Sequence, residues 1–135
     1  MKVYFLTKKS QTPAYLCQYL GDLAKPANVR LQVLRSGNGG EFISKVFKDV
    51  FSRHSITHQF TAPYSTHQIG VAEREWRTLM GMTRCFLSVP GLPKALWPEA
   101  VQTAVYIRNR SPSTFLRGRT PFEVWTGRIT KLHHF

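Results

Sequence analysis

The apolar positions of the chain follow two different periods in its first 60 residues. Apolar and polar residues alternate over 29–34 and 56–60, which predicts two short strands, and the β-prone run at 2–6 predicts a third. Between these runs apolar residues recur every three or four positions. That spacing predicts one helix from Pro13 to about residue 23 and another over 41–53.

The rest of the chain is predicted to be helical. A connector at 24–28 and a polar loop at 61–70 contain the prolines and glycines that interrupt regular structure. Helical spacing then extends over 71–88 and 93–109, and Thr-Pro-Phe-Glu-Val-Trp at 120–125 predicts a last helical turn. Strands that alternate with helices, followed by further helices, predict an α/β fold.

Charge is the strongest compositional signal. Nineteen Lys and Arg face seven Asp and Glu, which gives a formal net charge of +12. Eleven of the nineteen are Arg, whose planar guanidinium binds phosphate through two hydrogen bonds. A polyanion, most simply nucleic acid, is therefore the expected partner, although a basic surface can also serve solubility alone.

Other classes of protein are disfavoured by the same composition. The apolar run near the start is only four residues long, which predicts neither a secreted protein nor a membrane partner. Cys17 and Cys85 are far apart, and the five histidines do not join them at the spacing of a zinc site. We expect free thiols and, if the chain is expressed, a nuclear or cytoplasmic location.

The helix predicted over 71–88 carries charged residues at a regular spacing. Glu73 lies in its first turn, where a carboxylate interacts favourably with the helix dipole. Arg77 and Arg84 are four and eleven residues further on, so all three share one face. A carboxylate among arginines suits a metal site beside a phosphate backbone. It equally suits a solvated stripe of ion pairs, and the helix alone does not decide between them.

Several motifs resemble one known family, the integrase catalytic core of copia-type retrotransposons, which has a ribonuclease H-like fold. Gly37 and Glu73 are separated by 35 residues, and the motifs around them match the family pattern. The matching segments are RSGNGGEF (35–42), APY (62–64), QIGVAER (68–74), GLPKALWPEAVQTAVYIRNRSP (91–112) and TPFEVWTG (120–127). The resemblance implies a partial integrase core over 1–127 and a truncated exit segment over 128–135.

The resemblance also implies a site with too few metal ligands. In this family three carboxylates hold two Mg²⁺ or Mn²⁺ ions for DNA strand transfer. Glu73 matches the third carboxylate, Gly37 stands where the second, an aspartate, belongs, and the first has no counterpart here. We therefore expect no metal cofactor and no enzymatic activity. The family's first two sheet strands are also absent, so we expect three short strands, four to five helices and poor stability.

Residual nucleic-acid binding, to DNA phosphates, is the expected function of such a degenerate core. Its candidate residues are basic or polar positions near the loop and on the helices: Arg35, Asn38, Arg74, Arg77, Arg84, Arg108 and Arg110, with Arg117, Arg119, Arg128 and Lys131 further on. Two alternatives stay open. The chain is a relic without function, or it is an interaction module that pairs with intact integrase subunits in an integrase-like oligomer.

Overall fold

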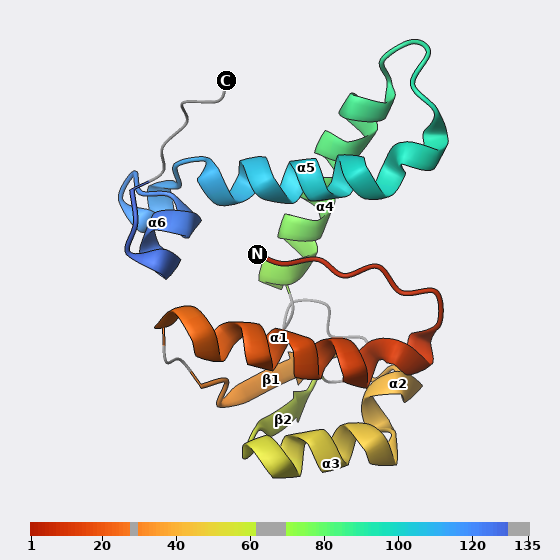
Figure 1. Cartoon of the computed structure of the whole chain (residues 1–135), viewed down its shortest axis with the longest axis vertical. Helices are drawn as coiled ribbons and strands as arrows, with labels where there is room; N and C mark the ends of the chain where they lie inside the picture. The colour runs from red at the N-terminus through yellow and green to blue at the C-terminus, as the bar shows by residue number, and fades with distance from the viewer. Residues whose placement is uncertain (28–29, 62–69, 130–135) are drawn as a thin grey trace. The chain divides into compact units, whose positions relative to one another are not determined.

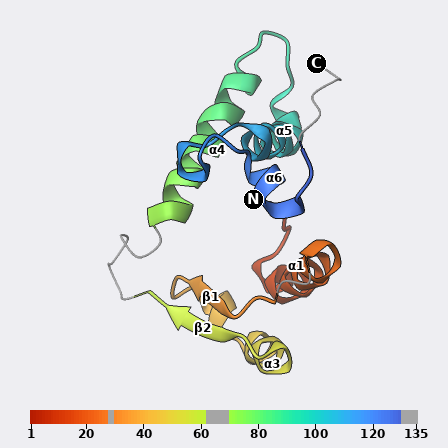
Figure 2. The same cartoon turned by 90° about the vertical axis from the view of Figure 1, so that its left-hand side faces the viewer.

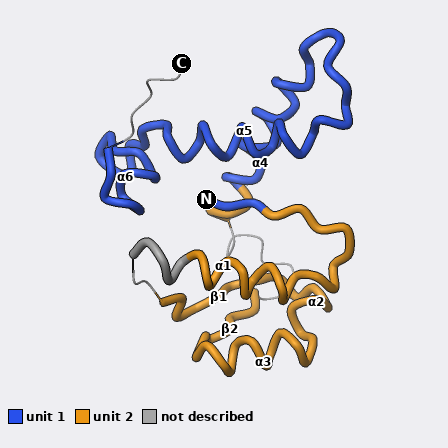
Figure 3. The backbone as a smooth tube through the Cα atoms, in the orientation of Figure 1, with its two compact units in different colours: residues 1–3, 74–135 blue, residues 4–73 orange. Residues whose placement is uncertain are grey.

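A computed structural model describes residues 1–27, 30–61 and 70–129 of the chain. It divides into two compact units, which Figure 3 shows in different colours: Tyr4–Glu73 forms one, and Met1–Val3 with Arg74–Phe135 forms the other. Among the helices of the described segments, none combines the length and the apolar character needed to cross a bilayer.

The unit formed by Tyr4–Glu73 is built on a parallel strand pair (Figure 1). Its elements in chain order are α1 (Thr12–Ala27), β1 (Val33–Ser36), α2 (Gly40–Ile43), α3 (Lys45–His54) and β2 (Thr57–Phe60). The register runs from Val33 opposite Thr57 to Ser36 opposite Phe60. Helices α2 and α3 therefore form the crossover that a parallel pair requires.

One face of this strand pair is covered and contributes to the core. Leu16 of α1 packs with Phe47, Val50 and Phe51 of α3, and Leu34 of β1 packs against this cluster. Phe47 is 1% exposed, and its ring meets that of Phe51 edge-on at 4.9 Å. Alternate strand residues point the other way, which is why Val33 and Arg35 are exposed.

The helix predicted over 41–53 is present but broken at Ser44. This residue has extended backbone angles and caps α3 by accepting a hydrogen bond from the Phe47 amide at 3.4 Å. At the other end Ser55 takes a left-handed conformation with φ 53, and Ile56 donates to the Phe51 carbonyl at 2.9 Å. These two ends place β2 directly after α3, as the sequence predicts.

The other unit is helical, and the two views in Figures 1 and 2 show α4 and α5 crossing. Helix α4 (Gly70–Leu87) lies in this unit from Arg74 onward, followed by α5 (Trp97–Arg110) and α6 (Pro121–Thr126). Leu79 of α4 packs with Ala104 and Val105 of α5, and Ala104 is fully buried. A small residue at that position lets the two helices approach closely.

Helix α6 begins and ends as its sequence predicts. Thr120 accepts from the Glu123 amide at 3.1 Å, and the Glu123 carboxylate accepts from the Thr120 amide at 2.9 Å. Pro121 occupies the first helical position, and Gly127 ends the helix in a left-handed conformation with φ 68. This reciprocal capping stabilises a helix of only six residues.

The predicted α/β fold class is confirmed, but the strand predicted at 2–6 is wrong. These residues form no regular secondary structure, and β1 and β2 pair only with each other within the described residues. A strand forms only by hydrogen bonding to a neighbour, and residues 2–6 pair with neither β1 nor β2. Val3 instead packs on the Leu79 cluster, while the ring of Tyr4 lies 5.4 Å from that of Tyr15.

Two boundaries also differ from the prediction. Helix α1 continues through the predicted connector to Ala27, although Pro26 has no backbone amide hydrogen to donate. The strand predicted over 29–34 occupies Val33–Ser36, so Arg35 and Ser36 of the predicted loop belong to it. Most of the predicted polar loop, 62–69, and the end of the exit segment, 130–135, lie outside the described residues.

Candidate functional site

The glycine loop follows β1 directly and is fastened to the end of β2. Gly37 comes after the last strand residue, Ser36, whose carbonyl accepts from the Thr61 amide at 3.0 Å. The Asn38 side-chain amide donates to the Thr61 carbonyl at 3.1 Å. Because the carboxyl ends of parallel strands meet at one edge, this loop occupies the place where α/β proteins usually bind ligands.

The backbone at Gly37 does not itself require glycine. A Cβ atom built there meets nothing within 4 Å, and its φ lies outside the left-handed region. At Gly39, by contrast, a Cβ atom would lie 2.7 Å from a carboxylate oxygen of Glu41. The loop therefore has room for a side chain at its first position, and the residue present supplies none.

A buried serine and a histidine form the polar contact behind this loop. Ser36 donates to the Gly37 carbonyl at 3.0 Å, and its hydroxyl lies 2.8 Å from Nε2 of His58. The His58 ring packs 4.4 Å from that of Phe51 and 4.0 Å from that of Phe60. Burial lowers the pKa of His58 below its ordinary value, so the ring is neutral at pH 7.

Sequence reasoning did not select Ser36 or His58. The available signal is the strand alternation, which places both on one face once the register is known. Their contact holds the start of the loop against the core.

The residues present do not fit a pair of divalent cations. Glu73 is exposed in the first turn of α4, and Glu41 lies against Gly39. Among the described residues, no group of three or more His, Cys, Asp or Glu side chains lies together in a way that could hold a metal ion. Two-metal chemistry needs several hard oxygen ligands around the same point, and this donor set does not provide them.

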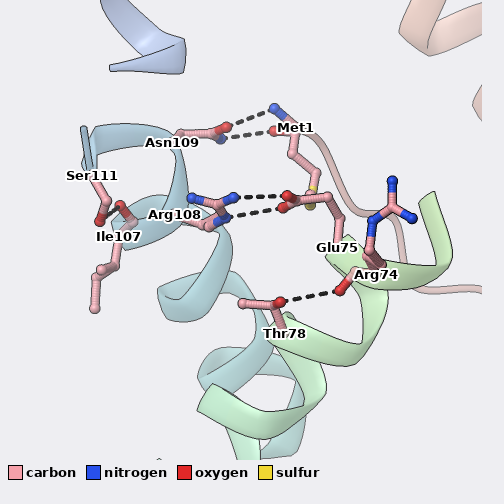
Figure 4. Close-up of polar contacts among 8 residues, drawn as sticks. All are labelled: Met1, Arg74, Glu75, Thr78, Ile107, Arg108, Asn109 and Ser111. Carbon is pink, nitrogen blue, oxygen red and sulfur yellow. Dashed lines mark hydrogen bonds and ion pairs between the residues drawn. The ribbon is translucent and has the colours of Figure 1, made fainter. Parts of the chain in front are cut away.

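Helix α4 presents a basic and largely exposed face. Arg74, Arg77 and Arg84 are all exposed, and Trp76 between them is 54% exposed. Figure 4 shows the Arg74 side chain pointing away from the neighbouring helix. Because α4 is continuous from Gly70 to Leu87, Arg77 and Arg84 share one face of it.

Within the described residues, Glu75 of α4 forms an ion pair, although the sequence did not mark it as a candidate. Arg108 of α5 donates from Nε to Oε2 at 2.9 Å and from Nη2 to Oε1 at 2.7 Å (Figure 4). These hydrogen bonds hold the pKa of Glu75 below, and that of Arg108 above, their usual values. No local pattern marks this pair, because its members are 33 residues apart.

Other predicted binding residues also have partners within the chain. The Arg110 guanidinium lies 3.7 Å from the ring centre of Tyr106 and 4.6 Å from that of Phe122. Arg35 donates to the Gln59 side chain at 2.9 Å across the strand pair. The remaining candidates in the described segments, Arg117, Arg119 and Arg128, are exposed, and Lys131 lies outside those segments.

Comparison with known proteins identifies the source of this arrangement. No family model matches the chain. It is 39% identical over 132 residues to the retrovirus-related Pol polyprotein from transposon TNT 1-94 of Nicotiana tabacum, which covers 98% of the chain. It is 34% identical over 121 residues, 90% of the chain, to the Pol polyprotein from transposon RE2 of Arabidopsis thaliana. The chain therefore resembles one segment of these transposon Pol polyproteins.

Solved structures agree with this assignment at the level of the fold. One is the HTLV-2 integrase catalytic core domain in complex with magnesium, in its trimeric form. The match covers 87% of this chain and 69% of the integrase chain, with a TM-score of 0.63 and 20% sequence identity. Another is a chain of the simian T-cell lymphotropic virus intasome in complex with PP2A regulatory subunit B56 gamma. The match covers 96% of this chain and 46% of the intasome chain, with a TM-score of 0.71 and 19% sequence identity.

The chain spans only 10% and 8% of the length of the two plant polyproteins. The predicted resemblance is thus confirmed. The roles of Gly37 and Glu73, and the binding residues, stay predictions. Cys17 and Cys85 are free, as predicted, and both are exposed.

Proposed function

We propose that this chain is a catalytically silent integrase-derived domain that binds DNA through phosphate contacts. The observation that carries the proposal is a loop scaffold with room for a ligand side chain at Gly37 and none present. The scaffold itself is held by Ser36 and Asn38. At this position the loss is therefore of a side chain and not of the loop that presents it.

The proposed lack of catalytic activity follows from the small number of metal ligands that these residues offer. The integrase core from HTLV-2 is described in complex with magnesium, and a divalent cation of this kind prefers carboxylate oxygens. Gly37 offers none, and the Asn38 amide nitrogen is committed to the Thr61 carbonyl. Glu73 alone leaves a cation with mostly water ligands, so neither a nucleophile nor a leaving group would be activated.

Phosphate binding follows from the exposed arginines of α4. Arg74, Arg77 and Arg84 lie on a rigid helix, and the nearby Glu75 is occupied by Arg108 and so does not neutralise them through an ion pair of its own. Three exposed guanidinium groups on one helix suit successive phosphates of a nucleic-acid backbone. Such contacts give weak sequence preference and strong salt dependence.

The test is duplex DNA binding measured by fluorescence anisotropy across a salt series. Replacing Arg74, Arg77 and Arg84 by Gln is expected to weaken binding and to reduce the slope of log affinity against log salt by about 2 to 3. The matched control replaces Lys9, Lys45 and Lys48, which are also exposed, by Gln. It removes the same charge and should change the slope far less.

Equal effects of the two triple variants would show that α4 is not the contact surface. Absence of any salt-dependent binding by the unaltered chain would refute DNA binding altogether. That second result would favour the two alternatives, a relic or an interaction module. Because the HTLV-2 core is described in a trimeric form, co-sedimentation with an intact integrase would then distinguish between them.

A further inference from the structure

The segment that joins α5 to α6 is a tightly closed turn. The Ser113 carbonyl accepts from Leu116 and from Gly118 at 3.0 Å each, and the Ser113 amide donates to Arg119 at 3.1 Å. Arg117 adds a hydrogen bond to the Thr114 carbonyl at 3.0 Å. Five backbone hydrogen bonds over seven residues, 113–119, hold this turn in one conformation.

The turn holds an aromatic side chain in water. Phe115 is 96% exposed, the most exposed of the large apolar residues described. A fully solvated ring contributes nothing to the core, so the fold does not account for its presence. Arg117 takes a left-handed conformation with φ 54, which is unfavourable for a residue with a side chain. Such conformations are concentrated at functional sites.

The surroundings of Phe115 are basic. Arg117 and Arg119 follow it in the same turn, Arg128 comes after α6, and all three are exposed. No acidic residue occurs between 100 and 122, and the Glu123 carboxylate is held in the capping box of α6. An apolar pocket on a partner protein would accept the ring but would not explain the arginines.

We infer that the turn 113–119, which we call the Phe115 turn, binds single-stranded nucleic acid. Phe115 stacks on an unpaired base while Arg117 and Arg119 contact the phosphates on either side. Stacking on an exposed aromatic ring beside a basic track is the general mode of sequence-tolerant single-strand binding. The rigid turn favours single-strand binding, because little conformational entropy is lost when the strand binds. This surface is separate from the arginines of α4 and needs no contribution from them.

The test compares a labelled oligothymidine of about 12 nucleotides with a blunt duplex, both bound to the full chain. Phe115→Ala should weaken single-strand binding roughly 5- to 150-fold, the loss expected for one stacked base. Duplex affinity should change less than about twofold. Phe115→Trp keeps a ring and should retain affinity for the oligothymidine.

Two further variants complete the design. Ile129→Ala removes another exposed apolar side chain, 83% exposed and next to Arg128, and should leave single-strand binding unchanged. Arg117→Gly removes a charge at a position whose backbone suits glycine, so it will not unfold the turn. It should lower the single-strand affinity and reduce its salt slope by about 0.7.

The inference is overturned if Phe115→Ala leaves oligothymidine binding unchanged or weakens duplex binding equally. A Phe115→Ala effect on self-association alone would also overturn it, because the ring would then serve protein contacts. The two proposals fail separately in this assay. Loss of duplex binding through α4 would leave single-strand binding intact, and loss of stacking at Phe115 would leave duplex binding intact.

Discussion

The ion pair between Glu75 and Arg108 is the long-range polar contact whose strength can be tested most directly. It joins α4 to α5 through two hydrogen bonds of 2.9 and 2.7 Å. Glu75→Gln and Arg108→Gln each remove one charge and keep a polar group, and the first also keeps the length of the side chain. The variant with both changes completes a double-mutant cycle, which isolates the interaction between the two residues.

The expected coupling follows from geometry and exposure. Solvent-exposed pairs contribute roughly 0.2–1 kcal/mol, whereas hydrogen bonds to charged groups contribute about 1.5–3 kcal/mol. Here the side chains are 29% and 30% exposed, so water screens the pair only in part. We expect a coupling of about 1–2 kcal/mol, because the bidentate geometry exceeds that of an ordinary surface pair.

The assay uses the distribution of tryptophan. Trp76, Trp97 and Trp125 are the three tryptophans of the chain, and all belong to the unit that contains the pair. Their fluorescence during urea unfolding therefore reports on that unit alone. Glu99→Gln, which alters an exposed carboxylate of α5, serves as the control and should change stability by less than about 0.5 kcal/mol.

The pH dependence of the coupling free energy is a second test of the same ion pair. Because the pKa of Glu75 is lowered in the folded chain, its contribution is fully present above the carboxyl's ordinary pKa. That contribution disappears as pH falls through the lowered value, when the carboxylate is protonated. A coupling below about 0.3 kcal/mol at neutral pH, or one that does not decrease in acid, would refute this reasoning.

Two further predictions concern the other unit. Phe47→Ala should lower the free energy of unfolding by about 3–5 kcal/mol, measured by hydrogen exchange of α3 and β2. The control Val46→Ala, at a neighbouring site that is 57% exposed, should lower it by less than about 0.5 kcal/mol. Similar losses in the two variants would show that Phe47 is not central to the core. Because burial lowers the pKa of His58, the unfolded chain binds a proton more readily, so stability should fall as pH drops below about 6.5 and stop falling below the lowered pKa. His58→Gln should flatten this dependence in thermal melts, but the same change at exposed His54 should not, and an unchanged profile in His58→Gln would contradict the assignment.

Local signals in the sequence predict most of the helices. The helix now seen as Gly70–Leu87 follows from apolar spacing, and α6 follows from Thr120, Pro121 and Glu123, whose roles depend only on near neighbours. The run at 2–6 fails because strand formation depends on a partner elsewhere in the chain. β-propensity alone therefore could not decide whether those residues pair.

In the candidate site, too, local features could be predicted from sequence and long-range contacts could not. The motif around Gly37 and its position after a strand could be predicted from sequence, since the loop is local. The contacts of Ser36 with His58 and of Arg108 with Glu75 could not, because they depend on strand register and helix crossing. The contact of Arg110 with Tyr106 is local, because the two are four residues apart on α5, whereas its contact with Phe122 depends on how α6 packs.

A DNA strand-transfer assay with Mg²⁺ and with Mn²⁺ tests the central claim most directly. The chain should form no joined product with either metal under conditions in which an active integrase core does, because Gly37 provides no ligand. Strand-transfer product that disappears in Glu73→Gln would contradict the account, since it would show that a working metal site forms around this carboxylate.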